Sequence, residues 1–239
     1  GIYAGGYYPS NNRDDQIDYF TIASTGNAAD FGDLTSATRH AGGSASATRG
    51  IIAGGSRTPE GMTVDIDYIT IASLGNGADF GDMTSARQTP YGASNHIRAC
   101  FNWGVAPSSS YTNAVDYITI ATLGNAEDFG DLDGVRAGAG VCSNSIKGVF
   151  GGGYNPSSLV TIQQVNIATI GNAFQFGDLV AANKTLAAHS SPTRAVFGGG
   201  LSDVIQYNEF ATAGDAVDFG DLLETNQQLS ATSNAHGGL

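Results

Sequence analysis

Short apolar runs alternate with polar, glycine-rich segments along the whole chain, and the pattern recurs at a nearly constant interval. A run of β-branched and aromatic residues, such as 66–71, is followed by a Gly-Asn pair and then by a segment ending in Phe-Gly-Asp. Such runs favour strands, and Gly-Asn pairs favour tight turns. No stretch keeps apolar residues at i, i+3, i+4 and i+7 over three turns, so the pattern predicts an all-β protein.

The tripeptide Phe-Gly-Asp marks five repeats of this pattern. It begins at Phe31, Phe80, Phe129, Phe176 and Phe219, at spacings of 49, 49, 47 and 43 residues. Recurrence at such a period is typical of repeat architectures, including propellers. It predicts one domain of five units, approximately residues 1–34 with 223–239, 35–83, 84–132, 133–179 and 180–222.

Each unit is expected to contain four short strands, the first two exemplified by residues 137–143 and 149–153. A pair such as Gly75-Asn76 is expected to make a tight hairpin between the third and fourth strands. In the third strand Ile66 and Ile69 point to opposite faces, so neighbouring sheets should cover both faces. Four-stranded sheets that stack face to face around an axis form a β-propeller.

The two ends of the chain indicate how the ring closes. When the five units are aligned, the residues after Asp221 correspond to the first strand of a unit, whereas residues 1–6 correspond to the second strand. We therefore expect the C-terminal strand to complete the N-terminal blade, which would remove the free sheet edges. The predicted fold is a closed five-bladed β-propeller with four antiparallel strands per blade.

The repeats resemble kelch-type propellers in the Gly pair after an apolar strand, the Tyr-bearing third strand and the single aromatic of the fourth strand. That aromatic is Phe in all five units, and the kelch Trp is missing. More specifically, Thr-Ile-Ala-Thr, Gly-Asn-Ala and Asp-Phe-Gly-Asp-Leu, followed by a run such as Arg-Ala-Val-Phe-Gly-Gly-Gly, look like repeat proteins of marine tailed phages. This resemblance covers the whole chain and implies a structural or tail-fibre-like protein in a virion or an extracellular setting.

Charge and composition exclude several partners. The chain has 22 Asp and Glu against 10 Lys and Arg, a net charge of -12, which argues against nucleic acid because phosphate backbones require a basic face. No apolar run approaches the roughly 20 residues that cross a bilayer, so we expect no membrane insertion. Cys100 and Cys142 are expected to be buried free thiols.

The recurring charged residues are interpreted as scaffold, and no metal or cofactor is expected. Eight of the ten cations occupy two repeat positions. Each recurring carboxylate is expected to accept turn N–H groups or to pair with a local Arg, rather than to join a ring of metal ligands. The four histidines fall at different repeat phases and are expected to make local hydrogen bonds. The repeat carboxylates are Asp33, Asp82, Asp131, Asp178 and Asp221.

No catalytic residues are predicted. The chain lacks a G-x-S-x-G elbow and a phosphate-binding G-x-x-x-x-G-K-[ST] loop,. A glycoside hydrolase needs two carboxylates near the axis, and the strands expected there, within 37–47, 86–96, 136–144, 182–192 and 226–236, contain none. Such an enzyme would have to use loop acids such as Asp133 or Glu224.

The connections between second and third strands vary in length and composition, and they should share one rim of the propeller. Function concentrates on such loops. Trp103 stands where the other units have Gly and offers either a platform for a sugar or a packing residue between blades. The candidate ligand-binding residues are Trp103, Asn102, Tyr7, Tyr8, Arg57, Tyr111, Tyr154 and Asn155.

These observations predict a non-enzymatic recognition module that binds a host-surface glycan or receptor as part of a phage fibre or adhesin. One alternative is a structural virion or extracellular protein that contacts copies of itself or other virion proteins. A second alternative is a glycoside hydrolase.

Overall fold

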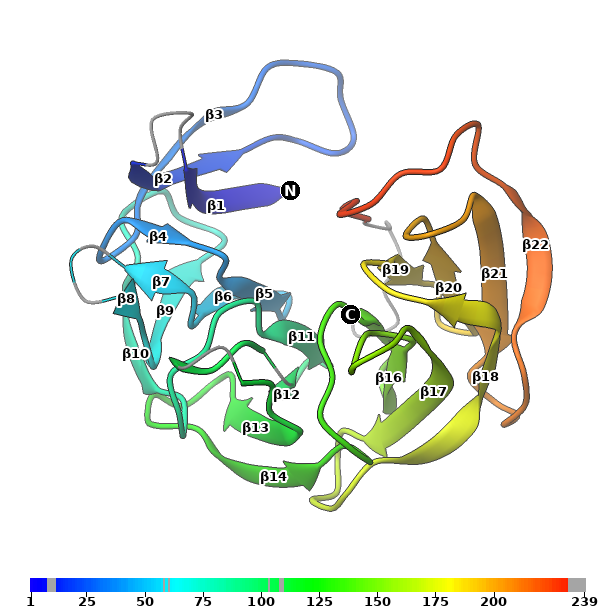
Figure 1. Cartoon of the computed structure of the whole chain (residues 1–239). Helices are drawn as coiled ribbons and strands as arrows, with labels where there is room; N and C mark the ends of the chain where they lie inside the picture. The colour runs from blue at the N-terminus through cyan, green and yellow to red at the C-terminus, as the bar shows by residue number, and fades with distance from the viewer. Residues whose placement is uncertain (8–11, 58, 60, 103, 108–109, 232–239) are drawn as a thin grey trace.

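The computed structural model describes residues 1–7, 12–57, 59, 61–102, 104–107 and 110–231. The described residues form no α-helix and build six antiparallel sheets of three or four strands, so the all-β prediction is confirmed. Five sheets follow one another along the chain and stand around a common centre in Figure 1, with a gap between the first and the last. No helix in the described part of the chain is long and apolar enough to span a membrane.

The five main sheets are named here in chain order. The first contains β1 (Ile2–Tyr7), β2 (Arg13–Tyr19) and β3 (Ala29–Asp33). The second contains β5 (Gly42–Ala45), β6 (Arg49–Ala53), β9 (Asp65–Thr70) and β10 (Ala78–Asp82). The third contains β11 (Tyr91–Ser94), β12 (Arg98–Asn102), β13 (Ala114–Thr119) and β14 (Glu127–Asp131).

The fourth sheet contains β15 (Gly140–Ser143), β16 (Lys147–Gly151), β17 (Leu159–Asn166) and β18 (Phe174–Asn183). The fifth contains β19 (Ala187–Ser190), β20 (Arg194–Gly198), β21 (Val204–Glu209) and β22 (Val217–Asp221). A small sixth sheet of β4 (Thr38–Arg39), β7 (Ser56–Arg57) and β8 (Gly61–Met62) is built from the connections on either side of the second sheet's inner strands, and its β4 lies beside β1 and β2 (Figure 1). Four strands per unit are thus observed in the second to fifth sheets.

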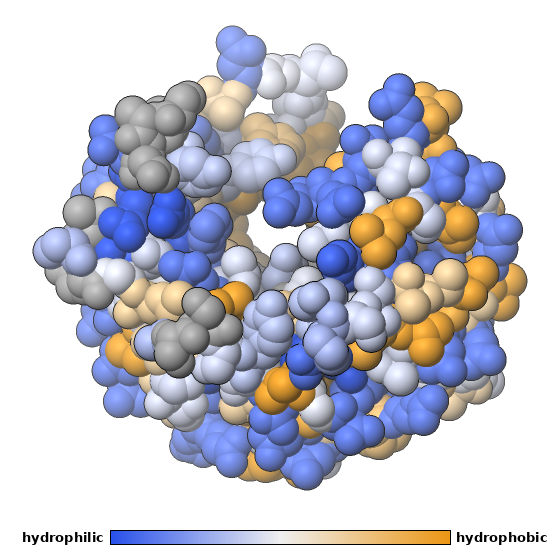
Figure 2. All heavy atoms as spheres, viewed as in Figure 1, coloured by the Kyte–Doolittle hydropathy of each residue, from blue (hydrophilic) through white to orange (hydrophobic). Residues whose placement is uncertain are grey.

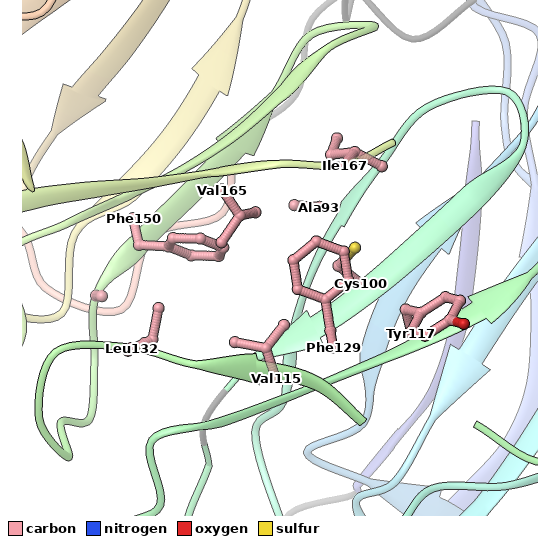
Figure 3. Close-up of a cluster of buried hydrophobic side chains, with 10 residues drawn as sticks. Ala93, Cys100, Val115, Tyr117, Phe129, Leu132, Phe150, Val165 and Ile167 are labelled. Carbon is pink, nitrogen blue, oxygen red and sulfur yellow. The ribbon is translucent and has the colours of Figure 1, made fainter. Parts of the chain in front are cut away.

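The hydrophobic core is divided among the junctions between consecutive sheets. Ile66 packs with residues of the third sheet, whereas Ile69, three positions further along β9, packs with residues of the first sheet. Figure 3 shows the junction between the third and fourth sheets, where Phe129 and Phe150 are buried together. The second, third and fourth sheets are therefore covered on both faces by their neighbours, as the sequence pattern predicts.

The Gly-Asn pairs have a different role from the predicted one. β9 and β10 are joined by a loop over residues 71–77, so the predicted tight hairpin at Gly75-Asn76 is wrong. Instead the Gly75 amide donates to the Phe31 carbonyl at 2.9 Å, and Asn76 Oδ1 accepts from the Asp33 amide at 3.2 Å. The same bonds recur at the next three junctions, with Asp215 in place of Asn at the last. The pair fastens each sheet to the outer strand of the preceding one.

Glycine is required at the outer strand for this contact. Gly32 has φ +145°, and a Cβ atom there would lie 2.5 Å from the carbonyl oxygen of Gly75. A side chain would therefore separate the two sheets. This explains the Gly of the recurring Phe-Gly-Asp.

The inner strands are joined by serine hydroxyls. Ser94 Oγ donates to the Ala45 carbonyl at 3.0 Å, Ser143 Oγ to the Ser94 carbonyl at 2.9 Å, and Ser190 Oγ to the Ser143 carbonyl at 2.6 Å. These four residues occupy one repeat position in β5, β11, β15 and β19. The hydroxyls therefore link four inner strands in succession, which positions the central opening. The inner strands are shorter than the ranges predicted for them.

The first sheet has three strands in the described part of the chain, so closure is not detected there. The repeat alignment places the missing inner strand at residues 230–233. Residues 222–231 form no strand, and residues 232–239 lie outside the described residues. The predicted pairing of the tail with the first unit is thus not observed in the described part of the tail.

Both cysteines are free and buried, as predicted. Burial raises the pKa of the Cys100 thiol to about 12, and burial likewise raises the pKa of the Cys142 thiol to about 12. Neither thiol is a nucleophile at neutral pH, because the thiolate is the reactive form.

Candidate variable-rim site

One rim of the molecule carries the variable connections. Because neighbouring strands are antiparallel, the connections from second to third strand lie at the same end as those from one sheet to the next. We call this end the variable rim. The small sheet of β4, β7 and β8 belongs to it and lies toward the viewer in Figure 1. In the same view, Figure 2 shows mainly hydrophilic residues and residues of intermediate hydropathy around the central opening.

Tyr7 is the centre of a group of polar and aromatic side chains on this rim. Its side chain is 57% exposed, the Arg39 guanidinium lies 5.7 Å from its ring centroid, and the His40 ring meets it edge-on at 6.2 Å. Arg13 is paired with Tyr7 across β1 and β2, and its Nη2 donates to Ser56 Oγ at 2.8 Å. We call Tyr7, Arg13, Arg39 and His40 the Tyr7 cluster.

Tyr154 forms a second such pair, between the fourth and fifth sheets. Lys184 Nζ lies 4.3 Å from its ring centroid, a distance at which a cation is attracted to the ring face,. The adjacent Asn155 donates from Nδ2 to the Val135 carbonyl at 2.9 Å, so its amide is committed to a loop contact.

The two tyrosine–cation pairs occupy equivalent positions of the repeat. Tyr7 and Tyr154 each follow the second-strand glycines, and Arg39 and Lys184 each lie in the connection to the next unit. The recurrence of a cation after Phe-Gly-Asp predicts a scaffold role for Arg39 and Lys184, a prediction that overlooks these pairs; Arg87 and Arg136 lie one repeat position earlier. The sequence does contain a sign of these pairs: the tyrosine and the cation are present together in two units and absent together in the other three. The equivalent residues there are Ser56 with Gln88, Val105 with Ala137, and Leu201 with Gln227.

Two of the predicted site residues are buried and therefore unavailable on the rim. Arg57 is 8% exposed, and its guanidinium pairs with Asp65 at 2.6 Å and with Asp67 at 3.0 Å. Asn102 is fully buried in β12. The Arg57 guanidinium is therefore committed to these two carboxylates, and the burial of both residues argues against their direct contact with a ligand.

The remaining predicted residues are placed as follows. Tyr111 is half-buried and bridged through its backbone to Val105. Trp103 and Tyr8 lie outside the described residues, so the proposed sugar platform at Trp103 stays a prediction. The structure brings Tyr7 and Tyr154 to the variable rim at separate junctions and does not bring them together.

Buried polar groups of the third strands hold the connections between units. Asp116 is 1% exposed and accepts from the Thr84 amide at 3.1 Å, from Thr84 Oγ1 at 2.7 Å and from Arg87 Nη2 at 2.6 Å. At the next two junctions neutral Gln163 and Gln206 accept the equivalent backbone amides. A buried charge that is fully hydrogen-bonded and paired is a structural group.

The Asp of each Phe-Gly-Asp lies in the outer strand of its sheet. In the first four sheets its backbone amide donates to an Asn or Asp side chain of the next unit. The described residues contain no group of three or more His, Cys, Asp or Glu arranged to hold a metal ion. The preceding repeat aspartates accept turn amides, as in Gly130 N to Asp128 Oδ1 at 3.0 Å. Asp79, Asp128 and Asp218, three positions before Asp82, Asp131 and Asp221, are thus turn acceptors, and this role stays a prediction for the repeat carboxylates named in the sequence analysis.

A cavity of about 610 Å³ occupies the centre, between the inner strands and the first sheet. Its lining, taken over the described residues, contains apolar side chains, serines and His189, and includes no Asp or Glu. Burial lowers the pKa of His189 below its ordinary value. This cavity therefore lacks the carboxylate pair of a glycoside hydrolase.

A search of protein-family models found no match for the chain, and a search of curated proteins found none either.

Proposed function

We propose that the chain is a closed five-bladed β-propeller whose variable rim recognises a surface glycan or receptor without catalysing a reaction. The setting would be a phage fibre or an extracellular adhesin. The observation that carries this proposal is the presence of tyrosine–cation pairs at equivalent rim positions of two different junctions. A repeated scaffold that varies its rim side chains presents different chemistry around one opening.

The described tail supports closure because it follows the path of the other inter-unit connections. Gln228 has φ 59°, and the same repeat position has φ 57° at His40, 53° at Thr89 and 55° at Thr185. The Gly200 amide donates to the Asn226 carbonyl at 2.8 Å, as the Gly153 amide donates to Asn183 at 2.9 Å. The tail therefore runs toward the place where an inner strand of the first sheet would begin.

The two edges that would meet at the seam are complementary. Phe219 is 60% exposed, whereas the equivalent Phe176 is 2% exposed beneath the following unit. A Cβ atom at Gly220 would meet nothing within 4 Å, whereas a Cβ atom at the equivalent glycine of each of the other four outer strands would meet the backbone of a loop glycine in the next unit. Contact between the Gly26 loop and β22 would reproduce the bonds seen at those junctions.

The serine position also continues into the tail. Ser233 falls on the repeat position of Ser94, Ser143 and Ser190. Its hydroxyl would donate to the carbonyl of Ser190 if residues 230–233 formed the fourth strand of the first sheet. The sequence of the tail is thus compatible with the bonding that joins the other inner strands.

The rim chemistry suits a polar ligand such as a saccharide. An exposed tyrosine ring offers an apolar surface for the C–H face of a sugar and a hydroxyl for a hydrogen bond. A cation against one face of that ring holds it in place and lowers the entropy lost on binding. Tyrosine with asparagine and serine is also the composition of other polar recognition surfaces.

The test is binding of the full chain to an array of microbial polysaccharides and host-surface glycans. We expect wild type to bind, and Tyr7→Ala or Tyr154→Ala to weaken binding at least about tenfold, as expected for an aromatic hot spot. Phe174→Ala, at a 54% exposed aromatic away from the variable rim, is the matched control and should bind as wild type does. Absence of wild-type binding across the array would overturn the proposed function.

A further inference from the structure

The rim opposite the variable rim carries an arc of exposed aliphatic side chains. This opposite rim is formed by the turns between the first and second strands and between the third and fourth strands of each sheet. In the second to fourth sheets these turns expose large aliphatic residues to solvent. They are Leu74 (63% exposed), Ile97 (50%), Leu123 (56%), Ile146 (56%) and Ile170 (58%), and we call them the aliphatic rim.

Backbone bonds connect the turns of the aliphatic rim. The Ile120 amide donates to the Ile97 carbonyl at 2.8 Å, which places the turn of Ile97 against the start of the Leu123 turn. The Ile167 amide makes the equivalent 2.8 Å bond to Ile146, next to the Ile170 turn. Successive sheets are joined by the Gly-Asn bonds described above. The five side chains thus lie at one end of three adjoining sheets.

These turns contain no Asp, Glu, Lys or Arg, and His96 is the one histidine among them. Residues 70–77, 94–97, 119–126, 143–146 and 166–173 lack Asp, Glu, Lys and Arg, although the chain has a net charge of -12. The nearest cations are half-buried and bonded to carbonyls, as in Arg98 Nη1 to Ala168 at 2.9 Å and Lys147 Nζ to Phe210 at 2.6 Å. The exposed Glu127, which directly follows the Leu123 turn, accepts from the Tyr117 hydroxyl at 2.6 Å. Because the turns themselves carry no carboxylates, a second acidic copy meets little like-charge repulsion at this rim.

We propose that the aliphatic rim binds the aliphatic rim of a second copy of this chain. Five side chains at this exposure together present on the order of 500 Å² of accessible surface. Two such faces together bury about 1,000 Å², which reaches the lower limit for a specific interface.

The chemistry of this rim favours a protein partner over a lipid surface. Segments that lie on membranes combine apolar residues with exposed Lys, Arg and Trp, and the turns of the aliphatic rim contain none of these. A face-to-face pair would leave both variable rims pointing outward, in opposite directions. The inference goes beyond the proposed function, because self-association is measured without any ligand.

The experiment is the molar mass of the full chain by light scattering during size-exclusion chromatography, from about 1 µM to 100 µM, a range that covers weak specific interfaces. We expect wild type to approach twice the 24.4 kDa of the chain as concentration rises. Leu123→Asp and Ile146→Asp would each bury an unpaired carboxylate in the interface and should raise the dissociation constant at least about tenfold.

Leu201→Asp is the matched control, because Leu201 is 46% exposed on the variable rim and should leave association unchanged. Circular dichroism of each variant checks that the strands are intact. The proposal is overturned if wild type stays monomeric at the highest concentration. It is also overturned if the dimer persists in both aliphatic-rim variants.

Discussion

The hydroxyl of Ser190 donates a 2.6 Å hydrogen bond to the main-chain carbonyl of Ser143, between the inner strands of the fifth and fourth sheets. Ser143 in turn donates to Ser94, whose amide donates back to the Ser143 hydroxyl at 3.0 Å. Adjacent inner strands of different sheets are therefore joined by side-chain-to-backbone bonds.

Loss of the Ser143 hydroxyl should destabilise the protein. Ser143→Ala removes one donated bond and leaves the Ser94 amide without its buried acceptor, so we expect the free energy of unfolding to fall by about 1–3 kcal/mol. Urea denaturation followed by circular dichroism measures the change. Ser145→Ala, two residues away and exposed, is the control and should change stability by less than about 0.5 kcal/mol,. Equal effects at the two serines would contradict the role assigned to Ser143.

Paired substitutions of phenylalanine test whether the ring closes. Phe176→Ala opens a cavity under the fifth sheet and should cost about 3–5 kcal/mol of unfolding free energy. If the first unit covers β22 in solution, Phe219→Ala should have a cost of similar size. A cost near zero for Phe219→Ala, beside a large cost for Phe176→Ala, would show that the seam stays open. Urea denaturation of both variants supplies the comparison.

The buried pair of Arg87 and Asp116 should be sensitive to the loss of one partner. Asp116→Ala leaves a guanidinium that is 0% exposed without its carboxylate, and we expect a loss of about 3–5 kcal/mol in chemical denaturation,. The double variant Arg87→Met with Asp116→Gln should recover most of this loss, because glutamine fills the same position in the fourth and fifth sheets.

The exposed pair of Arg194 and Glu209 is the control for that experiment. Its side chains are each 43% exposed, so Glu209→Ala should cost less than about 1 kcal/mol. A cost for Asp116→Ala no larger than this would mean that the buried pair does not hold the connection between the second and third sheets.

His189 should make stability fall as the pH is lowered. Burial lowers the pKa of His189 in the folded protein, so the unfolded chain takes up the proton first as the pH falls. The contribution of neutral His189 is complete above the unfolded pKa of about 6.5 and decreases as the pH falls below it. Urea denaturation at pH 7.5 and pH 5.5 should show a smaller difference for His189→Gln than for wild type. An unchanged difference would contradict this assignment.

The sequence was sufficient for the features that depend on local pattern and recurrence. The β-branched runs and the absence of helical periodicity predict the strands, and the spacing of Phe-Gly-Asp predicts the repeated sheets. Ile66 and Ile69 on opposite faces correctly indicate that the second sheet is covered on both sides. These properties follow from the alternation of side chains along a strand, which any single sequence displays.

The tertiary structure decided which residue meets which partner. Gly75-Asn76 carries the residues of a tight turn, yet it bonds to Phe31 and Asp33 in the preceding sheet. Arg57 occupies a variable loop but is buried between Asp65 and Asp67, whereas Arg39 of the supposed scaffold stacks on exposed Tyr7. Burial and pairing depend on contacts between strands and units that are separated along the chain, and a pattern read along one sequence does not specify them.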